Sequence, residues 1–436
     1  MRGVALIVCF IVISNLRPGY HVLADNEDIA CPEFKSIPLV GPLLLLTSSR
    51  SPQKSPVTFY LSTVKERSAV RVKEPNWPLL IRTGFDFSKK LYIVVHGYMG
   101  KSHDEWILDL KNKLLELGDG NVFLVDWKAG SNDINYVNSA RNTEVASAAI
   151  FNFLDSLKKV INERTVDKTN WRGVYFIGHS LGAQVSAQAA HLLKEDRFWT
   201  VDRITGLDPA KPCFTRTNLQ WKIDKGDANF VDIIHTQAGE DNKGINSLGL
   251  KESLGHVDFY VNGGVIQPNC ANLFLAPMLI QMGCSHKLSH IYFAESITNS
   301  IKGNCKFASY PWDGSYEDAI IAFKKRKTGE FCSDCPEMGI NASKSTKRGN
   351  FIVITAAESP YCGFSDKDQV PIMQVLGVNF HGKRAEQRRA SPPPPPPQAL
   401  RIIRVAWVRS VEKKILHHIF RLLCTFFQFI LFYYNV

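Results

Sequence analysis

The sequence predicts an α/β fold with a mostly parallel central sheet flanked by helices. Short runs rich in β-branched and other apolar residues recur along the chain. Stretches with helical spacing of apolar residues lie between these runs. Alternation of strands and helices is typical of an α/β architecture.

The expected elements follow one another over most of the chain. Strands are expected at residues 57–61, 91–95, 121–125, 174–177, 203–207, 230–235 and 350–355. Helices are expected at residues 103–117, 142–161 and 181–194. The segment from 25 to 55 shows neither pattern, and we expect it to be irregular.

Composition and charge restrict the classes of function. The chain has 436 residues, 45% hydrophobic and 21% charged, which suits a globular protein with a buried core. Its net charge is +11, partly from residues 383–414. A basic surface could bind anionic lipid headgroups, glycosaminoglycans or nucleic acid. We expect no nucleic-acid partner, because the chain lacks the interleaved aromatic and basic residues of RNA-binding modules.

The N-terminus has the features of a secretory signal peptide at residues 1–24. Arg2 supplies positive charge, residues 4–13 are apolar, and residues 22–24 offer a small-residue cleavage site. The apolar run is short for a membrane span. We therefore expect a secreted, extracellular protein with disulfides among its ten cysteines, and glycosylation at Asn341 in an Asn-Ala-Ser sequon.

The C-terminal part differs in character from the expected domain at 25–365. The tail, residues 366–436, contains six consecutive prolines (392–397), a basic stretch and an apolar, aromatic run at 422–434. Three interpretations stay open: a membrane-associating tail that tethers the protein, an amphipathic helix for a partner, or an end without a selected role.

A candidate nucleophile lies in the sequence Gly178-His179-Ser180-Leu181-Gly182. A G-x-S-x-G pattern alone is weak evidence, but here a buried-strand pattern precedes it and a helix with many small residues follows. This is the strand, sharp turn and helix that expose a nucleophilic serine in α/β-hydrolases. The flanking glycines allow strand and helix to approach closely.

A serine hydroxyl requires a histidine base, which in turn requires an orienting carboxylate. Asp208 is the best carboxylate, because it ends the strand expected at 203–207, and the carboxyl ends of parallel strands border the ligand crevice. Four later histidines could supply the base, and the residues alone do not choose among them: His235, His256, His286 and His290.

An ester hydrolase also needs two backbone N–H groups for the oxyanion. Leu181, directly after the serine, should give one. The loop His96-Gly97-Tyr98 after the strand expected at 91–95 should give the other, and Tyr98 is our candidate.

Several strings together resemble the animal pancreatic-lipase-like family of secreted lipases, venom-type phospholipases and inactive insect yolk proteins. The resemblance covers about residues 57–362. It implies the α/β-hydrolase fold, the triad Ser180, Asp208 and His286, and oxyanion donors at Tyr98 and Leu181. The serine that yolk proteins lack is present, so we expect an active enzyme. The matching strings are His96-Gly97-Tyr98, Asp126-Trp127, Gly178-His179-Ser180-Leu181-Gly182-Ala183, Gly206-Leu207-Asp208-Pro209-Ala210, Gly255-His256-Val257-Asp258-Phe259-Tyr260, Asn262-Gly263-Gly264 and Cys284-Ser285-His286.

The resemblance further implies a lid bounded by a disulfide between Cys270 and Cys284. The 13 intervening residues are strongly apolar and suit contact with a lipid droplet or membrane surface. Short lids in this family accompany phospholipase activity at the first glycerol position. The expected function is thus acyl-ester hydrolysis of triglyceride or phospholipid, with acyl-chain preference undetermined. The alternative is an inactive, yolk-like lipid-binding protein.

Departures from the family pattern affect partners, metal and cysteines. The tail does not match the family's C-terminal β-sandwich, so we expect no docking cofactor protein. Asp224 and Asp227 match the spacing of a structural calcium site, although a solvated acidic turn would have the same sequence. Trp312 replaces a half-cystine. We therefore consider a Cys31–Cys362 disulfide, with one of Cys305, Cys332 and Cys335 left free.

Overall fold

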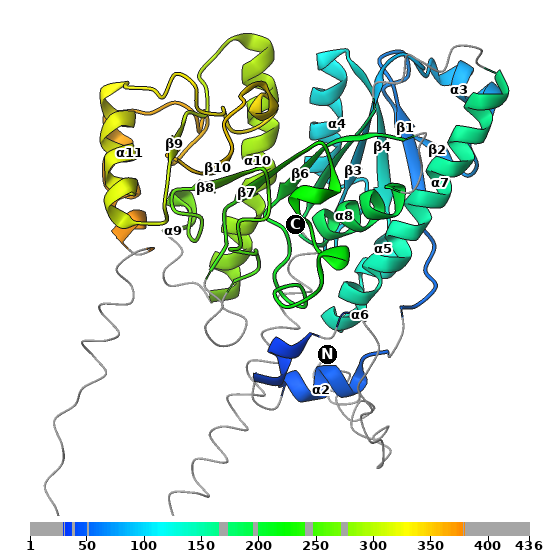
Figure 1. Cartoon of the computed structure of the whole chain (residues 1–436), viewed down its shortest axis with the longest axis horizontal. Helices are drawn as coiled ribbons and strands as arrows, with labels where there is room; N and C mark the ends of the chain where they lie inside the picture. Colours follow the sequence, from blue (N-terminus) through cyan, green and yellow to red (C-terminus); the bar gives the residue numbers. More distant parts are fainter. Residues whose placement is uncertain are drawn as a thin grey trace, which may run out of the picture. The chain divides into compact units, whose positions relative to one another are not determined.

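The computed structural model describes residues 29, 31–36, 40–49, 52–164, 173–194, 199–239, 247–271, 278–377 and 379 (Figure 1). The expected signal peptide at 1–24 and the proline-rich, basic and apolar parts of the tail lie outside these residues. No described helix combines the length and the hydropathy needed to cross a membrane.

The described residues form a ten-stranded sheet in the order β2-β1-β4-β3-β5-β6-β7-β8-β10-β9. The described strands from β4 to β10 in this order run parallel to one another, whereas the pairs β2–β1, β1–β4 and β10–β9 are antiparallel. This is the mostly parallel sheet that the sequence predicts. The strands are β1 (Thr58–Ser62), β2 (Val70–Val72), β3 (Lys90–Val95), β4 (Gly120–Asp126), β5 (Val174–His179), β6 (Val201–Leu207), β7 (Phe230–His235), β8 (Val257–Val261), β9 (Ser309–Pro311) and β10 (Gly349–Val353).

Helices connect the strands and cover both faces of the sheet (Figure 1). The α-helices are α2 (Val40–Thr47), α3 (Trp77–Thr83), α4 (Glu105–Leu117), α5 (Lys128–Ser131), α6 (Tyr136–Arg141), α7 (Thr143–Arg164), α8 (Leu181–Leu193), α9 (Pro268–Ala271), α10 (Met278–Lys302) and α11 (Tyr316–Thr328). The short 3-10 helices are η1 (Pro32–Ser36), η2 (Leu219–Trp221), η3 (Lys225–Asp227), η4 (Ala342–Lys344) and η5 (Asp366–Asp368).

The core has two layers because side chains alternate along each strand. In β3, Leu91 and Val95 point into the cluster that α7 and α8 cover, whereas Tyr92 and Val94 point into the one that α4 and α10 cover. Since both faces are buried, the parallel strands are apolar throughout. This layering aligns the carboxyl ends of β3, β5, β6 and β7 at one edge.

Two expectations about domain limits need correction. The packed domain continues beyond residue 365, because a helical stretch at 369–377 buries Ile372, Val375 and Leu376. Their spacing of three and four residues is that of one helix face. The segment before residue 55 is not irregular throughout: it contains η1 and α2, and Leu44 and Leu45 of α2 pack against the core.

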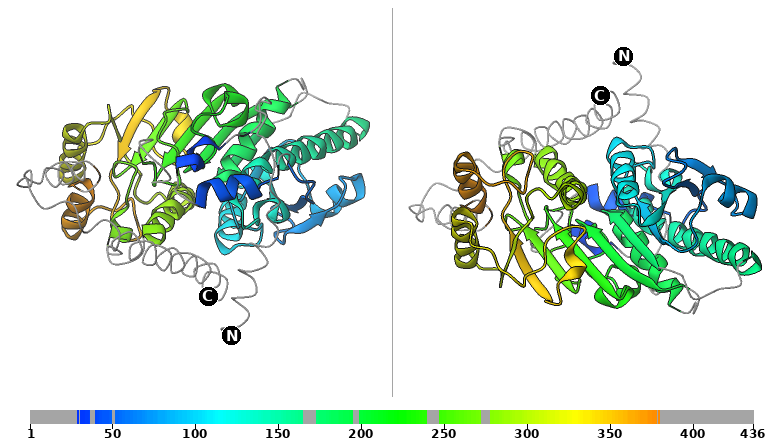
Figure 2. Two further views of the ribbon diagram at one scale, coloured as in Figure 1. Left: turned by 90° about the horizontal axis from the view of Figure 1, so that it is seen from below. Right: turned by 90° about the horizontal axis from the view of Figure 1, so that it is seen from above.

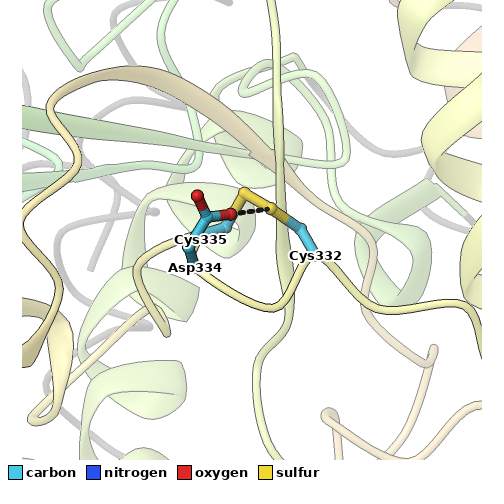
Figure 3. A group of neighbouring side chains, drawn as sticks. All are labelled: Cys332, Asp334 and Cys335. Atoms are coloured by element: carbon cyan, nitrogen blue, oxygen red, sulfur yellow. Dashed lines mark hydrogen bonds between the residues drawn. A yellow bond between two sulfur atoms is a disulfide. The ribbon is translucent and has the colours of Figure 1, made fainter.

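The disulfides also differ from expectation. The bonds are Cys31–Cys213, Cys270–Cys284, Cys305–Cys362 and Cys332–Cys335. The considered Cys31–Cys362 pair is wrong, and none of these eight cysteines is free. Cys332 and Cys335 pair with each other in an exposed turn beside Asp334 (Figure 3). Pairing follows from proximity in the folded chain, which cysteine spacing does not specify.

Candidate active site

Ser180 lies in the turn between β5 and α8 with φ 57° and ψ −122°. This left-handed φ is costly for a residue with a side chain, and such strain is concentrated at functional sites. Two backbone hydrogen bonds join Ser180 to residues before and after Asp208, at the end of β6. Ser180 N–H donates to the Leu207 carbonyl (3.0 Å), and Ala210 N–H donates to the Ser180 carbonyl (3.1 Å). The turn geometry is that of a nucleophile elbow.

Two glycines make this turn possible. A Cβ on Gly178 would collide with the backbone of Gly182 and Ala183, and one on Gly182 would collide with the Val95 carbonyl. Helix α8 therefore starts in direct backbone contact with the strand ends, as the sequence pattern predicts. This close approach holds Ser180 at the carboxyl edge of the sheet.

Asp208 and His286 are joined in the structure. Asp208 follows β6, is fully buried, and accepts from His286 Nδ1 at 2.5 Å through Oδ2. Its Oδ1 accepts from the N–H groups of Thr236 (2.8 Å) and Gln237 (3.1 Å) after β7. Since a carboxylate can only accept, Nδ1 of His286 carries the proton, and in the neutral ring Nε2 is the acceptor. Among the described residues no hydrogen bond joins His286 to the Ser180 hydroxyl.

The other three candidate histidines have different surroundings. His235 is buried between the Leu250 carbonyl (2.8 Å from Nδ1) and Asp258 (2.8 Å from Nε2), so both of its ring nitrogens are occupied by protein groups. His256 accepts from Val231 N–H. His290 stacks on Trp106. Of the four, His286 alone contacts Asp208, which is the choice that the family resemblance implies.

A buried glutamine, Gln267, links the loop whose N–H groups hold Asp208 to the helix that carries His286. Its Nε2 donates to the carbonyls of Thr236 (2.9 Å) and Val261 (2.8 Å), and its Oε1 accepts from Asn262 (3.0 Å). Its backbone N–H donates to Ser285 Oγ, next to His286 (3.2 Å). Sequence analysis did not identify this residue, because nothing in the local pattern marks a glutamine whose partners are distant in sequence.

The loop after β3 lies against the candidate nucleophile. A Cβ on Gly97 would lie 2.8 Å from Ser180 Cβ and 3.4 Å from its Oγ. The loop is braced by His96: Trp127 N–H donates to its Nε2 (3.1 Å), so Nδ1 must carry the proton that faces the Gly97 carbonyl (3.0 Å). Burial lowers the pKa of His96, which keeps the ring neutral. Tyr98 is anchored by its hydroxyl, which donates to the Asp133 carbonyl (2.8 Å).

The predicted oxyanion donors are Leu181, which follows Ser180, and Tyr98, in the loop next to it. Leu181 is the first residue of α8, so its N–H has no partner within the helix. Tyr98 follows the glycine that touches the serine side chain. That their backbone N–H groups stabilise an oxyanion stays a prediction.

Aromatic rings surround His286. The ring of His179 lies 4.6 Å from it, between centroids, and His179 Nε2 lies 3.3 Å from the His286 carbonyl. His290 and Trp106 continue the cluster. Burial lowers the pKa of His179 strongly and that of His290 to about 3. Both rings are therefore neutral at physiological pH and leave His286 without a cationic neighbour in this cluster.

The Cys270–Cys284 disulfide closes a segment next to His286. Residues 272–277, with the predicted lid side chains Leu273, Phe274 and Leu275, lie outside the described residues. Within the described part, Met282 is buried and Ile280 is half-buried. The function of this segment as a lid stays a prediction.

The expected calcium ligands are engaged with protein groups. Asp224 and Asp227 form a capping box around η3, in which Asp224 Oδ1 accepts from Gly226 N–H and Asp227 Oδ2 accepts from Asp224 N–H. Lys194 Nζ lies 3.2 Å from Asp227 Oδ1. Burial raises the pKa of Asp227 to about 7. An ammonium group and a partly protonated carboxyl do not fit a hard cation, so the calcium site stays an expectation without support from this arrangement.

The predicted glycosylation site is accessible. Asn341 precedes η4 and is partly exposed, and its amide donates to Glu337 at 3.3 Å. Occupancy of this sequon by a glycan stays a prediction.

Comparison with known proteins places this architecture in a family. The model of the family described as Lipase matches residues 37–361. The chain belongs to the Lipase family. This lipase-family chain is similar to Lipase member H-A of Xenopus laevis (34% identity, 65% of this chain and 59% of the relative). It is also similar to pancreatic triacylglycerol lipase of Sus scrofa (29%, 69% and 64%).

A third relative bears on activity. Inactive pancreatic lipase-related protein 1 of Mus musculus is 32% identical over 70% of the lipase-family chain and 62% of its own length. The chain thus spans roughly 60% of the length of the curated relatives it matches. Among solved structures, the esterase Est1E of Butyrivibrio proteoclasticus aligns with 13% identity, 43% of this chain, 76% of its own length and a TM-score of 0.22.

Proposed function

We propose that this protein is a secreted, serine-dependent carboxylic-ester hydrolase that acts on lipids. The observation that carries the proposal is the convergence of three residues from separate segments, the β5–α8 turn, the loop after β6 and helix α10. Ser180 lies in a strained elbow, and its backbone is bonded on both sides of Asp208, whose carboxylate holds His286. An inactive lipid-binding protein would not need a strained serine beside a buried histidine–aspartate pair.

The proposed reaction proceeds through an acyl-enzyme. His286 Nε2 takes the proton of Ser180 Oγ as that oxygen attacks the ester carbonyl carbon. The N–H groups of Tyr98 and Leu181 stabilise the oxyanion. His286 returns the proton to the leaving alcohol as the carbon–oxygen bond breaks. Water then attacks the acyl-enzyme, with His286 again as base, and releases the carboxylic acid and Ser180.

The proposed substrates are acyl esters of glycerolipids, either triglycerides or phospholipids, with cleavage at the first glycerol position. Membership of the Lipase family and similarity to a triacylglycerol lipase support a lipid substrate. The short segment between Cys270 and Cys284 supports the phospholipid branch. The four disulfides suit an extracellular protein.

Fluorophosphonate labelling tests the enzyme proposal directly. We expect the purified full chain to be labelled at Ser180, and the Ser180→Ala variant to lose both labelling and hydrolysis of a soluble short-chain ester. Failure of a folded wild-type chain to react would favour the inactive alternative, which is pertinent because one similar protein is named inactive. Rates on triglyceride emulsion and phospholipid vesicles, measured side by side, then separate the two substrate branches.

A further inference from the structure

His179 is the residue immediately before Ser180, and its side chain lies against the candidate base. It is the last residue of β5, and its side chain is buried. Its ring centroid lies 4.6 Å from that of His286. Nε2 of His179 donates to the His286 carbonyl at 3.3 Å, since a carbonyl oxygen can only accept. One residue thus touches both the turn that carries the nucleophile and the helix that carries the base.

Two further aromatic rings hold the ring of His179. Trp106, at the start of α4, meets it edge to face with centroids 5.6 Å apart. His290, one helical turn after His286 on α10, meets it at 89° with centroids 5.1 Å apart. Trp106 and His290 stack on each other at 4.4 Å. These separations and angles are those at which aromatic rings attract each other, so the ring of His179 is fixed by contacts with three others.

The helices that supply these rings are packed on one face of the sheet. Helices α4 and α10 lie side by side (Figure 2), and Leu110 of α4 and Leu288 of α10 belong to the same buried cluster. Trp106 and His290 also line a cavity of about 500 Å³, whose lining among the described residues includes neither His179 nor His286. The two stacked rings therefore separate His179 from this cavity.

The link through His179 bears on the distance between nucleophile and base. Proton transfer from Ser180 Oγ to His286 Nε2 requires the two atoms within hydrogen-bond reach. Among the described residues no hydrogen bond joins these two side chains, so their separation depends on the segments that carry them. His179 is bonded covalently to Ser180, and its ring touches His286. Burial lowers the pKa of His179, so its neutral ring does not repel the imidazolium that His286 becomes.

We propose that His179 is a positioning residue that sets the distance between Ser180 and His286. This inference rests on the proposed function, since it concerns the proton transfer of that reaction. His179 takes no part in bond making and acts through the placement of the His286 ring. Displacement of a catalytic group by about 1 Å can cost about a hundredfold in rate, so a ring contact of this kind has a measurable effect.

Turnover per active site separates this role from a role in stability. The full chain and its His179→Ala variant are titrated to completion with a fluorophosphonate, which counts the sites with a reactive Ser180, and are assayed on a soluble short-chain ester. We expect kcat per titrated site to fall about ten- to a hundredfold, with KM changed less than about twofold. His191→Ala, at an exposed histidine of α8, is the control and should keep the wild-type kcat. Fewer titratable sites with an unchanged kcat per site would overturn the proposal.

A conservative variant supplies the second comparison. His179→Phe keeps an aromatic ring next to His286 and Trp106 and loses only the Nε2 donor, whose acceptor still has the Ser289 hydroxyl at 2.9 Å. It should recover most of the rate that His179→Ala loses, and equal rates of the two variants would contradict the role of the ring. If His179→Ala does not fold, His290→Ala replaces it, because loss of a ring that holds His179 should lower kcat per site by about tenfold. A wild-type kcat in that variant would overturn the proposal.

A spectroscopic measurement tests the placement of His286 without turnover. In the chain labelled with ¹⁵N-histidine, the Nδ1 proton of His286, held by Asp208 at 2.5 Å, should give a strongly downfield resonance. His179→Ala should shift this resonance or broaden it through exchange with water, whereas His191→Ala should not. An unchanged resonance in His179→Ala would overturn the inference. If the wild type hydrolyses no ester, the proposed function fails, while this resonance still decides whether His179 positions His286.

Discussion

At the residue scale, the candidate site depends on which hydrogen bonds each buried side chain can make. Asp208 has donors on both oxygens, and this fixes the proton of His286 on Nδ1. His235 also contacts an aspartate, but its other ring nitrogen lies 2.8 Å from the Leu250 carbonyl. The two histidines thus differ at the second ring nitrogen, which a backbone carbonyl occupies in His235.

Substitution Asp208→Asn should invert the tautomer of His286. The N–H groups of Thr236 and Gln237 would hold the amide oxygen, so the NH₂ group would face Nδ1 and move the ring proton to Nε2. His286 could then no longer accept from Ser180. We expect kcat on a soluble ester to fall by about 10⁴. Asp202→Asn, at the opposite end of β6, is the control, and retention of a tenth of wild-type kcat by Asp208→Asn would contradict the assigned roles.

Asp227 should make stability depend on pH. Because burial raises its folded-state pKa to about 7, the native chain binds a proton that the unfolded chain has already released above about pH 4. The free energy of unfolding contributed by this group should therefore fall as pH rises from about 4 to about 7, by on the order of 2–4 kcal/mol.

Denaturant unfolding of wild type and Asp227→Asn across this window measures the effect of Asp227. As pH rises, the free energy of unfolding of the wild type should fall relative to that of Asp227→Asn. Calcium should leave the wild-type midpoint unchanged. A constant difference between the proteins would show that Asp227 is ionised in the native state, and a calcium-dependent rise in the wild-type midpoint that Asp227→Asn lacks would show that Asp227 binds the cation.

At the element scale, contacts between strand ends and helix starts position the site. Helix α8 approaches β3 and β5 through glycines, and α10 carries His286 next to the loops that follow β6 and β7. These contacts join backbone segments that are far apart in sequence. Substitutions at the glycines in these contacts are poorly tolerated, because the atoms next to them belong to the backbone and cannot move aside.

Gly182→Ala should destabilise the fold by about 3 kcal/mol or more, because its methyl group would meet the Val95 carbonyl in a contact that cannot relax without separating α8 from the sheet. Gly283→Ala is the matched comparison within α10. No atom lies within 4 Å of its added Cβ, so the substitution should raise stability by about 0.5–1 kcal/mol through helix propensity. Thermal unfolding of the two variants measures the contrast, and similar midpoints would refute the packing argument.

Gln267→Leu should reduce kcat by about ten- to a hundredfold with little change in KM on a soluble ester. The glutamine binds the loops that carry the donors to Asp208 and the serine beside His286, so its loss displaces the base without touching substrate. Gln267→Glu retains an acceptor for Asn262 but loses the donor to the carbonyls of Thr236 and Val261, so it should not recover the rate. Equal effects on kcat and KM, or a loss that follows only the unfolded fraction, would assign Gln267 to stability alone.

At the scale of the whole molecule, disulfides join segments that the chain order separates. Cys31–Cys213 spans 182 residues and ties the N-terminal segment to the loop after Asp208, whereas Cys332–Cys335 spans three. Closure of a longer loop removes more entropy from the unfolded chain. The first bond should therefore contribute more to global stability than the second.

Paired Cys→Ser substitutions compare the two bonds. Loss of Cys31–Cys213 should cost about 5 kcal/mol, and loss of Cys332–Cys335 about 2 kcal/mol, on the chain-entropy estimate. Thermal unfolding under non-reducing conditions gives the ranking. The reverse order of stability would contradict the entropic argument.

The sequence by itself determined the local elements of this protein. Apolar runs predicted seven of the strands with shifts of one or two residues at most ends, and the elbow Gly178–Gly182 marked the serine turn. These features depend on residues close together in the sequence. The period of the apolar side chains and the positions of the glycines are therefore enough to predict them. The strands β2, β8 and β9 and the helices α10 and α11 carried weaker local patterns and were not among the expected elements.

Only the tertiary structure decided which distant groups meet. The residues alone left four histidines open, and among them His286 is the one that contacts Asp208. The disulfide pairs, the burial of Ile372 and Leu376, and the link through Gln267 likewise depend on segments separated by tens to hundreds of residues. Chain order does not encode these distances, because they arise only when the sheet aligns its carboxyl ends and the helices pack across it.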